Sequence, residues 1–370
     1  MGRGAFLFLI LLLLDACVDR IVFDVDTPST FSIVVDGYIS DEPGPYVIKI
    51  SKAFDIESKL SIKTPITVKK LTLSDDEGTS EMLTEVRDGE YQTSVNGIRG
   101  VIGRKYSIEI ELLDGRVYQS TPDPLLPSGA VESVSYNYKE EKNPTGPSKY
   151  GFDVSFNSTS GRLDNYYFLW RFVGTFQVET NPELNTEPCG ESRCPKPLPC
   201  SAYALVNGEL TEVRPCECCT CWTSIFNTEP VISDNQIISD GQFSNVIAGY
   251  VPIDRWVFMH KVHAEVQQMS LSPQAFKFWK AVKAQKQANG SLFQPVAGKI
   301  PSNFFQVSGQ KGGGVEGIFF ATSIAKGSVF ITRDDVPDKS IIPESGLQYT
   351  GSCLTLFPNS TTTKPLYWVD

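Results

Sequence analysis

Alternating apolar and polar residues mark the first third of the chain. In "KYSIEIELL", Tyr106, Ile108 and Ile110 fall on one side of an extended strand, and the intervening glutamates fall on the other. This period of two is typical of a β-strand with one buried face. The next two residues, Asp114 and Gly115, readily adopt the positive φ angles of a tight turn. The pattern therefore predicts an antiparallel hairpin here.

Neighbouring segments repeat this alternation. "FSIVVDGYI" and "YVIKI" both predict short strands, and no helical period occurs before residue 125. Short strands with frequent turns favour an immunoglobulin-like β-sandwich, which we place at residues 31–126. "TPDPLLPSG" then brings three prolines, which cannot donate to a sheet, so we place a domain boundary at residues 121–129.

Strands resume after this boundary. "YYFLWRFVGTFQV" is apolar at both alternating sets of positions, which predicts a central strand covered on each face. Residues 181–222 contain many prolines and cysteines and no period, so we interpret them as an insertion between strands. Residues 127–370 are accordingly expected to form a larger β-rich domain.

One long helix is predicted, over about residues 273–288. Ser272 suits the N-cap, and Pro273 suits the first helical position, where its missing N–H costs nothing. A stripe of apolar residues at helical spacing is expected to pack into the core: Ala275, Phe276, Trp279 and Val282. The predicted fold class is therefore mainly β, an N-terminal immunoglobulin-like β-sandwich followed by a larger β-rich domain with one helix and a cysteine-rich insertion.

The N-terminus, "MGRGAFLFLILLLLDAC", has one basic residue and an apolar run too short to span a bilayer. Residues 14–17 are similar to a bacterial lipobox, although Asp15 stands where a small neutral residue is usual. We therefore expect a lipoprotein signal peptide at residues 1–16 and a lipidated tether at 17–30, anchored in the bilayer through acylated Cys17. The alternative is ordinary cleavage after Ala16, which leaves Cys17 as a plain thiol.

The cysteine count supports lipidation. The chain has nine cysteines, and acylation of Cys17 leaves eight that can pair: Cys189, Cys194, Cys200, Cys216, Cys218, Cys219, Cys221 and Cys353. We predict disulfides, because an exported chain meets an oxidising compartment. Adjacent cysteines rarely reach disulfide geometry, so Cys218 and Cys219 should have different partners. A zinc site is the alternative, since Cys218 and Cys221 have the spacing of zinc ligands.

Charge and composition exclude several classes of function. The net charge is −10, from 33 basic and 43 acidic residues, and without a basic cluster the chain does not favour nucleic acid. His260 and His263, the two histidines, would face opposite sides of a predicted strand. No hydrolase or phosphate-loop motif occurs in the sequence. We predict no catalytic residues, no metal ligands, no cofactor and no enzymatic activity.

The order of several motifs resembles a lipoprotein family of Bacteroidetes known as domain of unknown function 4249. After the lipobox come "GEY" and "GRKYSIEIELLDGRVYQS", with signature positions Gly103, Tyr106, Asp114, Gly115 and Tyr118. A Cys221–Trp222 pair, the "SLSPQAFKFWK" helix, Pro301 and Asn303, "GGVEGIFFATSIAKGSVFI" and "KPLYW" follow. The resemblance covers nearly the whole mature chain.

This resemblance implies an accessory lipoprotein that partners a TonB-dependent outer-membrane receptor in nutrient or peptide uptake. It would be anchored in the outer membrane, on a face that the sequence leaves undecided. The alternatives are a free-standing adhesin or glycan-binding lipoprotein and, less favoured, a hydrolase. A stapled insertion suits partner contact, with Trp222 as a candidate anchor. Alternatively, Trp222 covers the disulfides.

Overall fold

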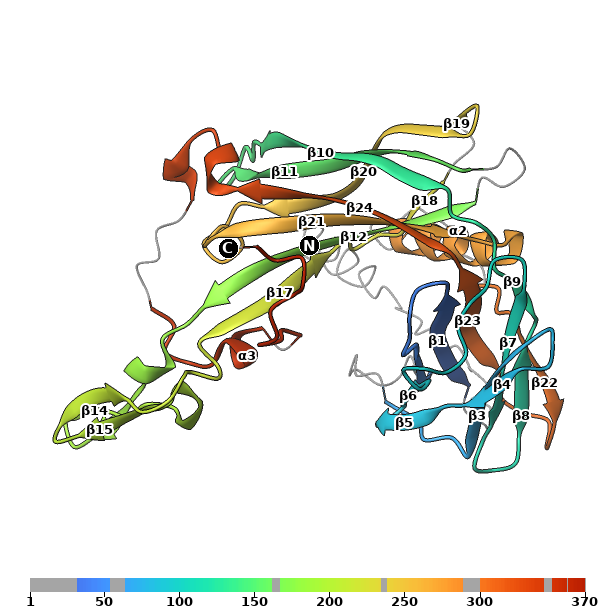
Figure 1. Ribbon diagram of the computed structural model, residues 1–370, viewed down its shortest axis with the longest axis horizontal. Helices are drawn as coiled ribbons and strands as arrows, with labels where there is room; N and C mark the ends of the chain where they lie inside the picture. Colours follow the sequence, from blue (N-terminus) through green and yellow to red (C-terminus); the bar gives the residue numbers. More distant parts are fainter. Residues whose placement is uncertain are drawn as a thin grey trace, which may run out of the picture.

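The computed structural model describes residues 32–53, 64–161, 167–233, 238–288, 300–342, 348–357 and 359–369. Strands account for 49% and helices for 10% of the structure, which confirms the mainly β fold class. Two β-sandwiches and a projecting arm make up the molecule (Figure 1). The arm and the N-terminal sandwich extend from the same side of the second sandwich, near its two ends.

The N-terminal sandwich packs two sheets on a shared apolar core. One sheet contains β1 (Ile33–Ser40), β2 (Val47–Lys52), β5 (Thr84–Arg87), β6 (Glu90–Gln92) and β23 (Val315–Thr322). The other contains β3 (Lys70–Asp75), β4 (Ser80–Met82), β7 (Lys105–Glu111), β8 (Val117–Ser120), β9 (Asp123–Pro124) and β22 (Phe304–Ser308). The alternating apolar residues face inward, among them Val35, Ile48, Leu73 and Ile108. The predicted hairpin is β7–β8, with Gly115 at a φ of 85°.

Two strands of this sandwich come from the far end of the chain. β23 pairs in parallel with β1 over its full length, and β22 pairs antiparallel with β8. Residues 31–126 therefore supply most of the sandwich, and residues 304–322 complete it. The glycine-rich segment between β22 and β23 crosses from one sheet to the other, where the Arg116 guanidinium donates to the Gly312 carbonyl oxygen at 2.7 Å. The strands on either side of this segment do not pair as a hairpin.

The second sandwich is larger and also has two sheets. The first contains β10 (Ala130–Glu141), β11 (Lys149–Thr159), β19 (Ile238–Ser239) and β20 (Gln242–Pro252). The second contains β12 (Phe168–Glu179), β17 (Thr220–Phe226), β18 (Val231–Ile232), β21 (Lys261–Ser270) and β24 (Ile324–Thr332). Their inner faces enclose an aromatic core centred on Trp170, whose indole N–H donates to Gln268 at 2.7 Å.

β12 is covered on both faces, as its sequence predicts. Phe168, Trp170 and Phe172 point into the sandwich core, whereas Leu169 points the other way and packs beneath α2 (Pro273–Ala288). The bounds of α2 match the predicted helix, and the Ser272 hydroxyl accepts the Ala275 N–H at 3.1 Å as its N-cap. The predicted apolar stripe joins the cluster that α2 forms with both sandwiches. The helix thus packs against both sandwiches and joins them.

Short helices complete the described elements: η1 (Pro182–Leu184), η2 (Pro199–Ser201), η3 (Arg333–Asp335), η4 (Lys339–Ile341) and α3 (Cys353–Leu356). Within the described ranges, no helix combines the length and the apolar character that crossing a membrane requires.

A buried carboxylate ties the junction between the sandwiches. Asp123 accepts from the Ser272 hydroxyl at 2.5 Å and from the Ala321 N–H at 3.0 Å, so it joins β9, the start of α2 and β23. Its side chain is buried, and this burial raises its pKa to about 6, against the opposing effect of the two hydrogen bonds. The junction is therefore held by apolar packing around a titratable group.

Candidate binding sites in the arm and between the sandwiches

The cysteine-rich insertion forms an arm of two small hairpins between β12 and β17. The first hairpin is β13 (Thr186–Cys189) with β14 (Ser192–Pro195), and the second is β15 (Tyr203–Val206) with β16 (Glu209–Glu212). We define the arm as residues 182–219. Sequence reasoning missed both hairpins, although Asn207-Gly208, with φ angles of 53° and 86°, is a strong turn signal for the second.

All eight cysteines predicted to pair form disulfides in the structure. Three bonds lie within the arm and one ties its base to α3: Cys189–Cys194, Cys200–Cys218, Cys216–Cys219 and Cys221–Cys353. Adjacent Cys218 and Cys219 take different partners, as expected. Cys17 lies outside the described residues.

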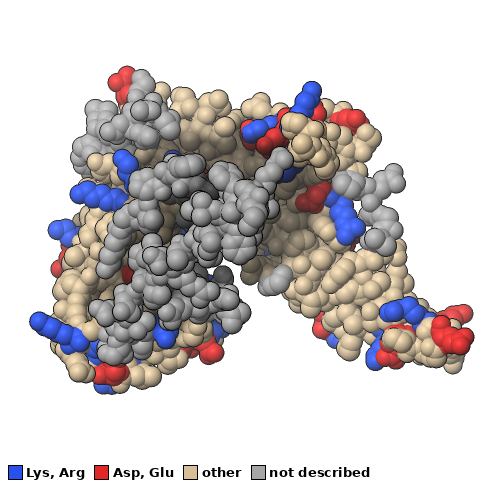
Figure 2. Space-filling view, turned by 180° about the vertical axis from the view of Figure 1, so that it is seen from behind, with Lys and Arg blue, Asp and Glu red and all other residues tan. Residues whose placement is uncertain are grey.

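The arm exposes apolar side chains despite its small size. Leu205 is 48% and Val213 is 61% exposed, and Val206 and Leu184 are also exposed. Figure 2 shows basic and acidic side chains gathered at the end of the arm, with uncharged surface between them and the body. Lys196 pairs with Glu187 and Arg214 pairs with Glu217, so the basic residues there are largely neutralised.

Trp222 is buried where β17 meets the C-terminal segment. Its side chain is 9% exposed and lies edge-on to Trp368, with 6.4 Å between the ring centroids. Its backbone pairs with Thr361 through two hydrogen bonds of 2.8 and 2.9 Å. Trp222 therefore packs at the base of the arm and is not part of the arm's exposed surface.

The two histidines lie in different surroundings. β21 begins at Lys261, so His260 precedes the strand on which it was expected, and its Nε2 lies 3.0 Å from a Glu179 carboxylate oxygen. His263 is buried and stacks on Tyr367 at a centroid distance of 4.0 Å. Burial lowers the pKa of His263, since the charged form loses hydration. Over the described part of the chain, no cluster of three or more His, Cys, Asp or Glu residues is placed to hold a metal.

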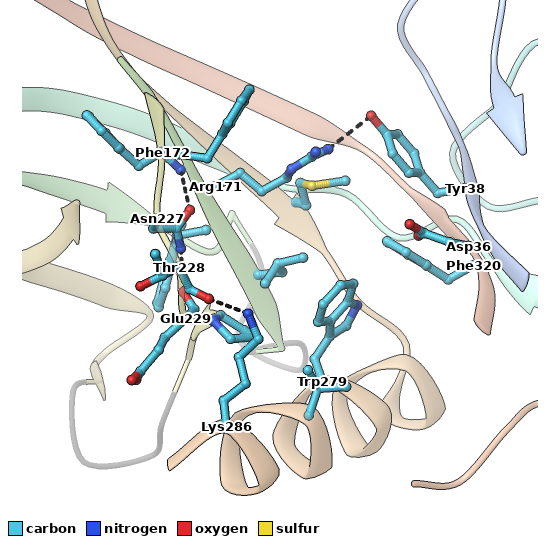
Figure 3. Close-up of a pocket in the computed structure, with 16 residues that line it drawn as sticks. Asp36, Tyr38, Arg171, Phe172, Asn227, Thr228, Glu229, Trp279, Lys286 and Phe320 are labelled. Atoms are coloured by element: carbon cyan, nitrogen blue, oxygen red, sulfur yellow. Dashed lines mark hydrogen bonds between the residues drawn. The ribbon is translucent and has the colours of Figure 1, made fainter. Parts of the chain in front are cut away.

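A cavity of about 490 Å³ opens between the sandwiches (Figure 3). Its wall combines β1 and β23 of the N-terminal sandwich, β12 and β21 of the second, α2, and the segment that connects β17 to β18. Apolar side chains form much of the lining: Tyr38, Leu169, Phe226, Met269, Trp279, Val282 and Phe320. This size and this lining are typical of a small-molecule site.

Several polar groups in the cavity are held in place. The Arg171 guanidinium donates to the Tyr38 hydroxyl at 3.2 Å and lies 5.7 Å from the centre of that ring. Asn227 accepts from the Phe172 N–H at 3.3 Å and donates to the Glu229 carbonyl oxygen at 2.6 Å. Lys286 of α2 donates to the Thr228 carbonyl oxygen. These bonds fix the connecting segment against β12 and α2, as Figure 3 shows.

Comparison with known families gives one match. The model of the family described as Domain of unknown function (DUF4249) matches residues 18–328, most of the chain. The chain belongs to this family. No curated protein matches it.

Three residues from the motifs that carry the resemblance to this family, Tyr106, Tyr118 and Asn303, have structural roles. The Tyr106 hydroxyl accepts the Val101 N–H at 2.8 Å, and the Tyr118 hydroxyl donates to the Gly312 carbonyl oxygen at 3.1 Å. The Asn303 side chain exchanges two hydrogen bonds with the backbone of Phe319, which fixes the register of β23. These hydrogen bonds stabilise the N-terminal sandwich, including β22 and β23, which come from late in the chain.

Sequence reasoning did not find the cavity between the sandwiches. Its residues come from six places in the chain, and each fits an ordinary pattern in its own element. The one local signal was Arg171, a charged residue in the middle of an otherwise apolar strand. Burial of a charge is costly unless the charge is paired or hydrogen-bonded, so a charged residue in an apolar strand is a candidate binding residue.

Proposed function

We propose that this DUF4249 protein is a non-enzymatic, lipid-anchored accessory subunit of a TonB-dependent outer-membrane transporter for nutrients or peptides. Its anchor is Cys17, and its arm contacts the receptor. The type of partner and the membrane come from the family resemblance and the lipobox. The arm is the structural observation that supports a contact role.

The arm suits this role because it is rigid before it binds. Three internal disulfides and the tie to α3 hold two hairpins that have little core of their own. A pre-organised surface loses less conformational entropy on binding, a saving of about 0.5–1.5 kcal/mol for each side chain already fixed. The exposed apolar residues at Leu205, Val206 and Val213 supply the kind of surface that a partner can cover.

Co-purification in detergent tests the proposal. The tagged full-length lipoprotein should retain a large β-barrel receptor, and replacement of residues 185–219 by a short Gly-Ser link should release it. This deletion removes six cysteines that pair only with one another and leaves Cys221–Cys353 intact. A milder variant, Leu205→Ser with Val213→Ser, should weaken retention without altering the disulfides.

Two outcomes would contradict the proposal. If a folded deletion variant retains the receptor and supports unchanged uptake, the arm only stabilises itself. If the intact protein retains no barrel, a free-standing adhesin or glycan-binding lipoprotein becomes the better account. Mass spectrometry of the mature protein should find the acyl chains on Cys17, and Cys17→Ser should release the protein from the membrane.

A further inference from the structure

The cavity between the sandwiches carries charges of both signs that do not neutralise one another. Arg171 lines it and is half-buried, whereas Lys286, Asp36 and Glu229 line it with exposed side chains. Among the residues that the structure describes, none of these four takes part in an ion pair within 4.0 Å. Their partners in hydrogen bonds are a neutral hydroxyl for Arg171 and a neutral carbonyl for Lys286.

These charges are arranged on different sides of the cavity. Asp36 lies beside Tyr38 and Phe320, on the N-terminal sandwich, whereas Lys286 lies beside Thr228 and Glu229 (Figure 3). Arg171 rises from β12 between them, over the Tyr38 ring. A ligand that carried only one kind of charge would meet both attraction and repulsion in this cavity, whereas a dipolar ligand can satisfy both signs.

Arg171 retains most of its hydrogen-bonding capacity. A guanidinium has five N–H donors, and only the Nη1 group has a described partner, the Tyr38 hydroxyl. The side chain is half-buried, where a cation without a counter-ion favours a carboxylate held by two parallel hydrogen bonds. The Tyr38 contact holds Arg171 in position before any ligand arrives.

The apolar wall accounts for the rest of a ligand. Trp279 and Phe320 meet edge-on at 6.3 Å between centroids, and Met269 and Leu169 are buried behind them. The Trp279 indole N–H is also buried, and within the described ranges it has no hydrogen-bond partner. An apolar side chain fits such a wall, and a backbone carbonyl is a natural acceptor for an indole N–H.

We propose that this cavity binds a short peptide with free ends and an apolar or aromatic side chain. Its terminal carboxylate pairs with Arg171, with Lys286 adding a second positive charge, and its ammonium lies on the side of Asp36. The apolar side chain packs against Trp279 and Phe320. The inference rests on the proposed function in one respect, since it names the class of cargo that the accessory subunit would hold.

Calorimetric titration of the purified full chain tests the peptide directly. The probe is Leu-Phe-Leu with free ends, compared with its C-terminal amide and its N-acetyl form. We expect the amide to bind roughly 10- to 100-fold more weakly, because it cannot form a charge-assisted pair with Arg171. The N-acetyl form should bind several-fold more weakly. Maltotriose, a neutral oligosaccharide, should not compete.

Variants assign these effects to residues. Arg171→Gln should weaken binding of the free-ended peptide by somewhat less than amidation does, and it should reduce the preference for the acid over the amide to a few-fold, the remainder coming from Lys286. Tyr38→Phe keeps the ring but removes the hydroxyl that holds Arg171, so it should weaken binding of the free-ended peptide several-fold and lower the acid-to-amide ratio, while the fold is unaffected. Lys286→Gln should weaken binding of the free-ended peptide by less than Arg171→Gln does, and Lys277→Gln, on the exposed surface of α2, is its matched control and should change nothing.

Each result decides the inference. An acid-to-amide ratio that Arg171→Gln leaves unchanged would falsify the carboxylate assignment, as would competition by maltotriose or the absence of peptide binding at millimolar concentration. These titrations contain no receptor. Peptide binding without receptor co-purification would therefore overturn only the proposed function, and co-purification without peptide binding would overturn only this inference.

Discussion

The arm and the sandwich from which it projects are both built from antiparallel strands, yet different forces hold them. In the second sandwich, inward-facing residues of two sheets form one aromatic core around Trp170. The arm is too small to enclose a core, and the hairpin residues Leu205 and Val206 remain exposed. Disulfides take the place of the core.

This contrast shows how one chain combines two sources of stability. Hydrophobic burial grows with the size of a domain, whereas a cross-link acts mainly by restricting the unfolded chain. Core truncations and changes of pH should therefore alter the stability of the sandwich, whereas reducing agents should alter the stability of the arm.

Removal of the disulfide between Cys221 and Cys353 should have the largest effect, because it joins the two kinds of structure. These residues are 132 positions apart, and the chain-entropy model assigns about 5 kcal/mol to a loop of that length. The double variant Cys221→Ala with Cys353→Ala should lower the free energy of unfolding by several kcal/mol in urea titrations. A loss below about 1 kcal/mol would show that the packing of α3 on β17 suffices without the cross-link.

Trp170→Ala should destabilise the second sandwich by about 3–5 kcal/mol, since it empties the centre of the core and leaves Gln268 without its indole partner. Leu205→Ala, a truncation on the exposed arm, is the matched control and should cost less than about 0.5 kcal/mol. Chemical denaturation of both variants gives the comparison. Similar losses at the two positions would contradict the division between core and arm.

Part of this architecture could be predicted from the sequence because the signals were local. Ser272 and Pro273 mark the start of α2, and Asp114-Gly115 marks the β7–β8 turn. The apolar residues on both faces of β12 predicted that both faces are buried. In each case the pattern that sets the structure lies within about twenty residues of chain.

The remainder depended on contacts that leave no local pattern. β23 pairs with β1 although more than half of the chain separates them in sequence. A buried strand has the same apolar sequence pattern whichever sheet it joins, so its partner could not be predicted. The predicted pairing of eight cysteines was confirmed, but their connectivity required the structure. The cavity could not be predicted either, because it forms between the two sandwiches. Arg171 and Tyr38 come into contact only when the sandwiches are packed together.

Asp123 should make the junction between the sandwiches sensitive to pH. Burial raises its folded-state pKa to about 6, above the unfolded value of 3.8, so its contribution is favourable at low pH and is lost as pH rises through 6. The size of this change is of order 2–3 kcal/mol. Asp123→Asn cannot titrate, so its stability should vary less between pH 4 and 7 than that of the parent chain. Equal pH profiles in thermal denaturation would show that the folded-state pKa of Asp123 is not raised above its unfolded value.

The smallest effect on global stability is expected from the double variant Cys200→Ala with Cys218→Ala, which opens the arm itself. This bond closes a loop with a separation of 18 residues, and the arm contributes almost nothing to the core of the second sandwich. The arm should become susceptible to protease near Tyr203–Val206. The free energy of unfolding of the body should change by less than about 0.5 kcal/mol. The parent chain under mild reduction should show the same cleavage, and Arg214→Gln, an exposed charge change in the arm, should not. Concerted unfolding of arm and body in the double variant would mean that the two regions are one cooperative unit, and the contrast between them would fail.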